Sequence, residues 1–213
     1  MADLEFFFDP GCPWAWATSR WVTEVVSIRN YEVSWKFLSL AMVNGDRGYG
    51  PNDDYHKTIH NFGLAALRVA SAARASEGNE GVRKFYTAFG TSFHNLKKRQ
   101  GSDTNPHQLL TEILQSQSLP TKWADAFDDE THTPIIRFET DLAISRAGKD
   151  LGAPILTFKP GTASEGTFFG PVIWKIPRGD DAAKFWDAIE TVATTPGMAE
   201  LKRARKSLDL TKI

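Results

Sequence analysis

The stretch FFFDPGCPWAWATSRW, residues 6–21, constrains the fold more than any other part of the chain. Its apolar, aromatic start predicts a short buried strand over residues 4–9, which Asp9, Pro10 and Gly11 then end. From Pro13 onward, apolar residues recur at spacings of three and four, which predicts a helix with proline at its first position. Residues 31–40 alternate with a period of two and predict a second strand. The order strand, helix, strand is typical of a parallel strand pair.

The middle of the chain has a different pattern. The segment AMVNGDRGYGPNDD is rich in Gly, Asn, Asp and Pro and is predicted to be a loop. From Tyr55 to Leu151 the periodicity is helical almost throughout, with its clearest apolar stripe between Val82 and Leu96. We therefore expect an all-helical insertion without strands.

Strand character returns near the C-terminus, at PILTF and at GTFFGPVIW. Gly170-Pro171 in the second segment indicates an edge strand, because proline cannot donate a hydrogen bond to a central ladder. An amphipathic helix that starts at Asp180 is expected to follow, and MAELKRARKSL predicts a second helix after it.

The predicted order is β-α-β, a helical insertion, and β-β-α, which is an α/β fold. This is the connectivity of a thioredoxin fold with an all-helical insertion between the second and third strands. We expect residues 1–45 and 150–213 to form the thioredoxin-like domain, and residues 46–149 to form a helical lid domain.

Cys12 is the only cysteine of the chain and would stand at the N-cap of the first helix. The unpaired amides and the positive dipole end of a helix N-terminus stabilise a thiolate. Cysteines in such places have pKa values of roughly 3.5 to 7.5, against about 8.5 for an unperturbed thiol. A lone cysteine in a cytosolic protein is usually an inert core residue, but Cys12 follows a Pro-Gly turn instead of lying on an apolar face. We therefore predict that Cys12 is a nucleophile.

Other residues are expected around this thiol. Pro13 begins the helix, and Trp14 is expected to cover one wall of a substrate groove. The segment GAPI, residues 152–155, leads into the third strand. A cis bond between Ala153 and Pro154 there would face Cys12, as in other thioredoxin folds.

Composition and patterning exclude several functions. The net charge of -1 gives no general bias toward nucleic acid, and the basic run LKRARK is expected to be a solvated helix face. No apolar run approaches the roughly 20 residues needed to span a bilayer, and the N-terminus has no signal-peptide pattern, so a cytoplasmic protein is predicted.

HKTIH lacks the glutamate of a zincin, which leaves His56 and His60 as a solvated or substrate-facing pair and predicts no metal. GDRGYG lacks the spacing of a phosphate loop, so no nucleotide is expected.

Several segments together resemble one known family: FDPGCPWAWATSRWVTEV, SLAMVN, FHN, DLGAPIL and FFGPVIWKIPRGDDAAKFWDAI through ELKRAR. They are similar to the actinobacterial DsbA-like family of mycothiol-dependent nitroreductases and thiol oxidoreductases. The resemblance implies a thioredoxin fold with a helical lid, a nucleophile at Cys12, a cis-proline at Pro154 and mycothiol as the small thiol. It further implies that Trp14, Asn44, Tyr55 and His94 surround the cysteine.

His94 has two interpretations. On its helix it lies near the edge of an apolar stripe, so it can be a packed, hydrogen-bonded histidine. The resemblance favours a catalytic role, in which His94 points from the lid toward Cys12 and orients or protonates a substrate.

The departure from the family pattern is Ala15, since better-known members carry a second cysteine there. Ala15 is either the natural residue of a one-cysteine variant, which we favour, or an engineered replacement. Without a second thiol, any mixed disulfide at Cys12 must be resolved by an outside thiol. The sequence thus predicts a thiol oxidoreductase that acts on small-molecule or protein disulfides or on electrophilic nitro compounds, with no nucleic-acid or membrane partner. The alternative is a non-catalytic binding module that has lost its redox pair.

Overall fold

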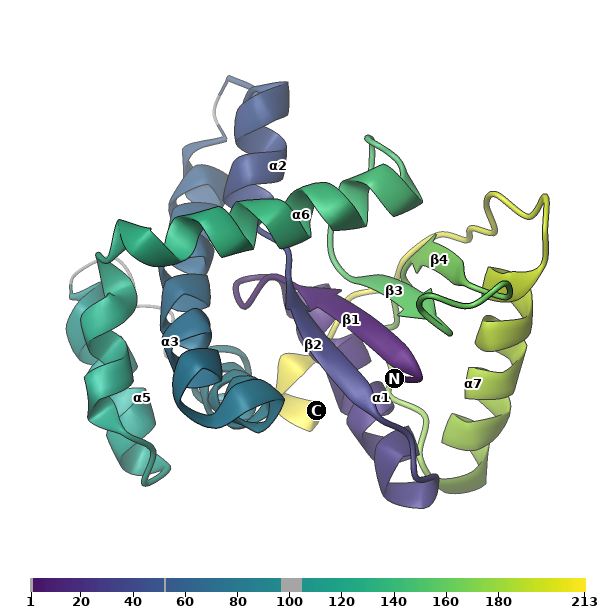
Figure 1. The fold of residues 1–213 in the computed structure, drawn as a ribbon, viewed down its shortest axis with the longest axis horizontal. Helices are drawn as coiled ribbons and strands as arrows, with labels where there is room; N and C mark the ends of the chain where they lie inside the picture. The colour runs from purple at the N-terminus through teal and green to yellow at the C-terminus, as the bar shows by residue number, and fades with distance from the viewer. Residues whose placement is uncertain (1, 52, 97–104) are drawn as a thin grey trace.

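The computed structural model describes residues 2–51, 53–96 and 105–213. A four-stranded sheet with the order β2-β1-β3-β4 lies at its centre (Figure 1). β1 (Leu4–Phe8) is parallel to β2 (Val33–Phe37) and antiparallel to β3 (Ile155–Phe158), which pairs antiparallel with β4 (Gly166–Phe169). The sheet order and the strand directions confirm the predicted α/β architecture.

Helices connect and follow these strands. α1 (Pro13–Ile28) joins β1 to β2, and α7 (Gly179–Thr194) follows β4. Between β2 and β3 the described residues form helices: α2 (Leu40–Arg47), α3 (Asp54–Gly90), η1 (Thr91–Asn95), α5 (Pro106–Ser116), η3 (Thr121–Phe127), η4 (Glu130–His132) and α6 (Thr133–Ala147). The helical insertion is therefore confirmed for the residues that can be described, while the helical prediction for residues 97–104 falls outside them. The boundary expected at residue 46 falls inside α2.

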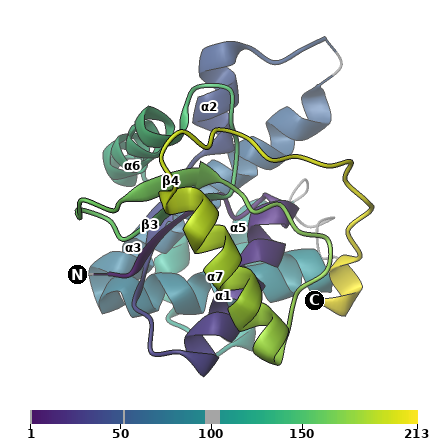
Figure 2. The same cartoon turned by 90° about the vertical axis from the view of Figure 1, so that its right-hand side faces the viewer.

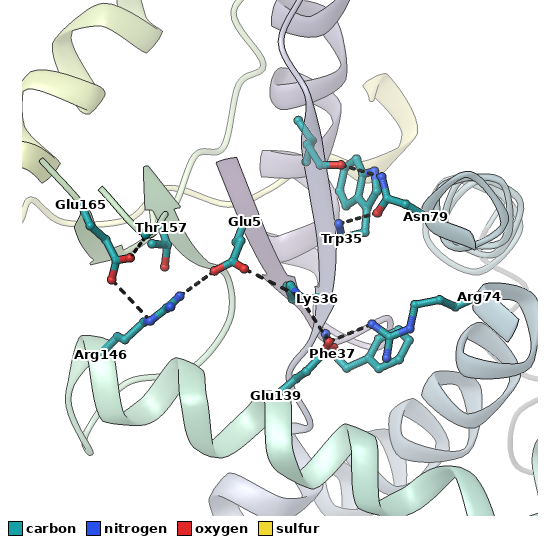
Figure 3. A network of polar contacts seen from close by, with 12 residues as sticks. Glu5, Trp35, Lys36, Phe37, Arg74, Asn79, Glu139, Arg146, Thr157 and Glu165 are labelled. Carbon is teal, nitrogen blue, oxygen red and sulfur yellow. Dashed lines mark hydrogen bonds and ion pairs between the residues drawn. The ribbon is translucent and has the colours of Figure 1, made fainter. Parts of the chain in front are cut away.

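The two faces of the sheet are covered in different ways. One face carries Phe8, which stacks on Tyr86 of α3 at 3.9 Å between ring centroids, and Phe158, which meets Trp186 of α7. Across the other face, α6 is held by ion pairs, from Arg146 to Glu5 at 2.5 Å and from Glu139 to Lys36 at 3.6 Å (Figure 3). The alternation of apolar and charged residues along β1 and β2 thus selects which helix covers which face.

Side chains of the insertion protect the outer edge of β2 (Figure 3). The Asn79 side chain accepts from the Trp35 amide at 2.8 Å and donates to the Val33 carbonyl at 2.6 Å. The Glu139 carboxylate accepts from the Phe37 amide at 2.8 Å. These groups take the place of a neighbouring strand and satisfy an edge that would otherwise be open to pairing with another chain.

Two expectations about local structure were wrong. Residues 41–47, expected in a loop, form α2 together with Leu40, because Ser39 caps it by accepting from the Met42 amide and its buried apolar residues supply a packed face. The second C-terminal helix is absent: the described residues between 198 and 209 have no regular secondary structure, and residues 201–207 are all exposed. A helix of this length is marginal without tertiary packing, and Leu201 stays exposed instead of packing on the core. The edge position of β4 is confirmed, and the strand ends at Phe169, just before Gly170-Pro171.

Candidate active site

Cys12 stands where the sequence predicts it, at the N-cap of α1. Its Sγ accepts from the Ala15 amide at 3.5 Å and lies 3.5 Å from the Ala153 carbonyl oxygen, to which the thiol donates. The bond between Ala153 and Pro154 is cis, as predicted. The thiol is 6% exposed. The end of β1, the first turn of α1 and the start of β3 together position this sulfur.

Asp9 lies beneath the cysteine turn and was not singled out as a site residue from the sequence. Its fully buried carboxylate accepts from the Gly11 amide and from the Leu40 amide, each at 2.8 Å. Burial raises the pKa of Asp9 to about 7, although the two backbone hydrogen bonds oppose the shift. Asp9 therefore ties the turn before Cys12 to the start of α2.

A cleft of about 260 Å³ opens beside the thiol. Three segments form its wall, namely the first turn of α1, the start of α2 and the first turns of α3. Its lining residues are Gly11, Cys12, Pro13, Trp14, Leu40, Tyr55, His56, Ile59 and His60. The mixture of apolar, aromatic and imidazole groups is typical of a small-molecule site.

His56 and His60, one turn apart on α3, are the imidazoles of this cleft. His60 Nδ1 lies 3.0 Å from the Tyr49 hydroxyl and 3.5 Å from Nδ2 of Asn44. Burial first, and the nearby His56 second, lower the pKa of His60, so it is neutral at pH 7. His56 pairs with Asp53. The substrate-facing interpretation of this pair fits their place in the cleft wall.

His94 lies behind the cysteine turn. Its Nε2 donates to the Pro10 carbonyl at 2.8 Å, and its ring lies parallel to that of Trp16. The side chain is 1% exposed and is absent from the cleft lining. This geometry suits a residue that positions the turn, and a catalytic role for His94 stays a prediction.

The remaining predicted residues divide into two groups. Pro13, Trp14 and Tyr55 line the cleft. Ala15 and Asn44 do not line the cleft. Ala15 is fully buried. The Asn44 side chain donates to the Leu40 carbonyl at 2.8 Å and also contacts His60.

One contact was not foreseen in any form. The guanidinium of Arg205, from the C-terminal segment, lies 5.7 Å from the centre of the Trp14 ring. No sequence signal relates a residue in that segment to the first helix, since they meet only through the fold.

A family model described as "Rv2466c-like: Mycothiol-dependent nitroreductase Rv2466c" matches residues 11–203. A protein of Mycobacterium tuberculosis, Rv2286c, described as uncharacterized, is 25% identical over 210 residues, which cover 99% of this chain and 85% of the relative.

Two solved structures of the cytosolic disulfide reductase DsbM from Pseudomonas aeruginosa are also similar. The one with GSH has a TM-score of 0.57 and covers 87% of this chain and 98% of DsbM; the other has 0.58 and covers 89% and 99%. Both are 16% identical to this chain, so the likeness concerns the fold. In the described part of the chain, no helix has the length and apolar character needed to cross a membrane.

Proposed function

Because this chain belongs to the Rv2466c-like family of mycothiol-dependent nitroreductases and is therefore a thiol-dependent oxidoreductase, we propose that Cys12 is its nucleophile and mycothiol its reductant. The observation that carries the proposal is the placement of Sγ at a helix N-cap, beside a cleft of small-molecule size. An amide donor and the helix dipole at that position both favour the thiolate. The family membership favours this enzyme over the alternative of a non-catalytic binding module.

The reaction proceeds with a single protein thiol. The Cys12 thiolate attacks one sulfur of a disulfide substrate, the S–S bond breaks, and one substrate thiolate leaves. A first mycothiol thiolate attacks Sγ and releases the second substrate thiolate, which leaves mycothiol bound to Cys12. A second mycothiol thiolate attacks the mycothiol sulfur, so mycothiol disulfide forms and the Cys12 thiolate returns. Two electrons pass from two mycothiols to one substrate disulfide, and the protons go to the released thiolates.

Neighbouring groups have separate parts in this scheme. Trp14, Pro13 and Tyr55 bind the organic part of the substrate, and the Ala153 carbonyl beside cis-Pro154 orients the chain of atoms attached to Sγ. Asn44 acts through His60, which it contacts, and neutral His60 offers a hydrogen bond in the cleft. His94 acts as a positioning residue through the Pro10 carbonyl.

Intact-protein mass spectrometry tests the proposal. Incubation with mycothiol disulfide is expected to add one mycothiol to the wild type and none to Cys12→Ser. Added mycothiol is then expected to remove the adduct. The proposal would be contradicted if the wild-type protein stays unmodified. It would also be contradicted if Cys12→Ser reduces a disulfide substrate as fast as the wild type does.

A nitroaromatic compound is the second candidate substrate, which the family description favours. In this case two mycothiols are oxidised to mycothiol disulfide at Cys12, and the nitro group takes up their two electrons and two protons and loses one oxygen as water, which gives the nitroso compound. Consumption of two mycothiols per such step, dependent on Cys12, is the expected stoichiometry. Consumption that is unchanged in Cys12→Ser would exclude it.

A further inference from the structure

The C-terminal segment of residues 201–206, LKRARK, has four cations in six residues and is called the basic segment. It follows α7 after six intervening residues and runs without regular structure toward the C-terminal turn η5 (Leu210–Lys212) (Figure 2). Since the expected helix does not form, these cations are not on one side of a solvated helix. Their position follows from where the extended chain is held.

Asn95 of η1 connects the end of the chain to the first helix. Asn95 donates to the Ile213 carbonyl at 2.8 Å and accepts from the Trp16 indole nitrogen at 2.7 Å. Leu208, Leu210 and Ile213 pack on the core. The basic segment thus precedes a chain end that is held at η1, where Asn95 links Ile213 to Trp16 of α1.

Within this segment, Arg205 is the residue whose positive charge lies near the cleft. Its guanidinium lies 5.7 Å from the ring of Trp14, and that ring lines the cleft next to Cys12. The side chains of Lys202, Arg203 and Lys206 are exposed and form no ion pair with the described residues. Glu200 directly precedes the segment, and Asp209 follows Lys206 by three residues. Arg205 therefore brings a positive charge to the Trp14 side of the cleft, and the other three cations are its neighbours in sequence.

The start of α3, which also lines the cleft, holds two acidic residues and one lysine, Lys57. Asp53 and Asp54 stand at the start of α3, next to Tyr55 and His56, and Asp53 is paired with His56. A ligand with a negative group is attracted to the Trp14 side and repelled from the α3 side. These charges therefore set both an orientation and a charge preference.

We propose that the basic segment is a specificity element that selects small oxidised substrates with an anionic group, such as a carboxylate, sulfonate or phosphate, for attack by Cys12. The proposal rests on Cys12 being the nucleophile. The modest size of the cleft, about 260 Å³, favours a small molecule over a folded protein. The cations act by raising the local concentration of the anion and by orienting it.

Stoichiometric reaction of Cys12 with two aromatic disulfides tests the proposal without mycothiol. Dithiobis(nitrobenzoate) has a carboxylate on each ring, whereas dithiodipyridine is neutral. In both reactions the Cys12 thiolate forms a mixed disulfide and expels one coloured aromatic thiolate or thione. The ratio of the two rate constants cancels any change in the thiolate fraction of Cys12.

The test variant is Lys202→Gln/Lys206→Gln, which leaves the contact of Arg205 with Trp14 in place. Its matched control is Lys122→Gln/Lys184→Gln, which removes two exposed lysines from η3 and α7. The ratio of the rate constant for the anionic probe to that for the neutral probe is expected to fall about threefold in the test variant and to stay unchanged in the control. High salt is expected to reduce the difference in this ratio between the wild type and the test variant.

The other outcomes would overturn either the specificity element alone or the nucleophile as well. A ratio that is equal in the test variant and the wild type, or that falls equally in the control, overturns the specificity element and leaves the nucleophile intact. Equal slowing with both probes means that the segment acts on Cys12 itself, which also overturns it. If wild-type protein releases no chromophore from either probe, Cys12 is not the nucleophile, and the proposed function fails together with this inference.

Discussion

The main-chain amide of Ala15 donates to Sγ of Cys12 at 3.5 Å. Residue 15 is where the family resemblance leads one to expect a second cysteine, and its contact with the first sulfur comes from the backbone. Because this contact uses the main-chain amide, it is present with alanine at position 15 just as it would be with cysteine. With alanine at position 15, the protein lacks a second thiol that could attack a mixed disulfide at Cys12 from within the same chain.

Ala15→Cys is expected to restore internal resolution. A thiol at this position, one turn into α1, displaces a small thiol bound to Cys12 and forms a disulfide with it, so the isolated protein loses its adduct and two hydrogen atoms in mass. Ala17→Cys is the control, because it is also buried in α1 but lies five residues from Cys12 in sequence. An adduct that persists in Ala15→Cys as long as in the wild type would contradict this expectation.

Asp9 is expected to make stability depend on pH in the acid range. Burial raises its folded-state pKa from 3.8 to about 7, so between these values the native state holds a proton that the unfolded state has lost. The free energy of unfolding therefore falls as pH rises from about 4 to about 7, by at most roughly 4 kcal/mol, since one pKa unit corresponds to about 1.4 kcal/mol. Above that range this contribution is constant.

Asp9→Asn isolates this effect. Urea unfolding measured at several pH values between 4 and 8 is expected to show a smaller slope in the variant than in the wild type, because the group no longer titrates. The variant also loses one of the two acceptors for the Gly11 and Leu40 amides, so the cysteine turn loosens and Cys12 reacts faster with bulky alkylating agents. Asp125→Asn, at an exposed position, controls for the loss of one charge. An unchanged slope in Asp9→Asn would refute this account.

Gly63 is expected to be required for the close approach of α3 to Asp9. A Cβ at this position would lie 2.4 Å from Oδ1 of Asp9. Gly63→Ala should therefore lower the free energy of unfolding by about 1–3 kcal/mol, which is the usual cost of overpacking. Gly45→Ala, in α2 with nothing within 4 Å of the new Cβ, should be neutral or stabilising by up to about 1 kcal/mol. Equal effects of the two substitutions on the denaturation midpoint would argue against the steric explanation.

Asn79 is expected to stabilise the sheet through the edge of β2. Asn79→Ala leaves the Trp35 amide and the Val33 carbonyl without their partner, and should cost about 1–3 kcal/mol in thermal or urea unfolding. It should also increase concentration-dependent association, since an open strand edge can pair with another chain. Asn61→Ala, at an exposed position of α3, is the control. Stability and association that match this control would show that the edge contacts are dispensable.

The sequence by itself determined the local elements around Cys12. Strand, turn and helix follow from aromatic periodicity, from the Pro-Gly break and from proline at the first helical position, all of which act over a few residues. The N-cap position of Cys12 and the absence of a resolving thiol follow from the same stretch, and the fold class follows from the order of such elements. Local signals sufficed here because each element is specified by its own residues.

Tertiary structure alone decided the contacts between segments that are distant in the chain. α2 forms because Ser39 caps it, because its apolar residues pack, and because Asp9, far back in the sequence, accepts from its first amide. The C-terminal basic segment is irregular and exposed, and its position relative to the cleft depends on the contact of Arg205 with Trp14 and on the later contact between Asn95 and Ile213. Burial of Asp9 and the approach of Arg205 to Trp14 depend on the position of several elements at once, and no local pattern encodes that position.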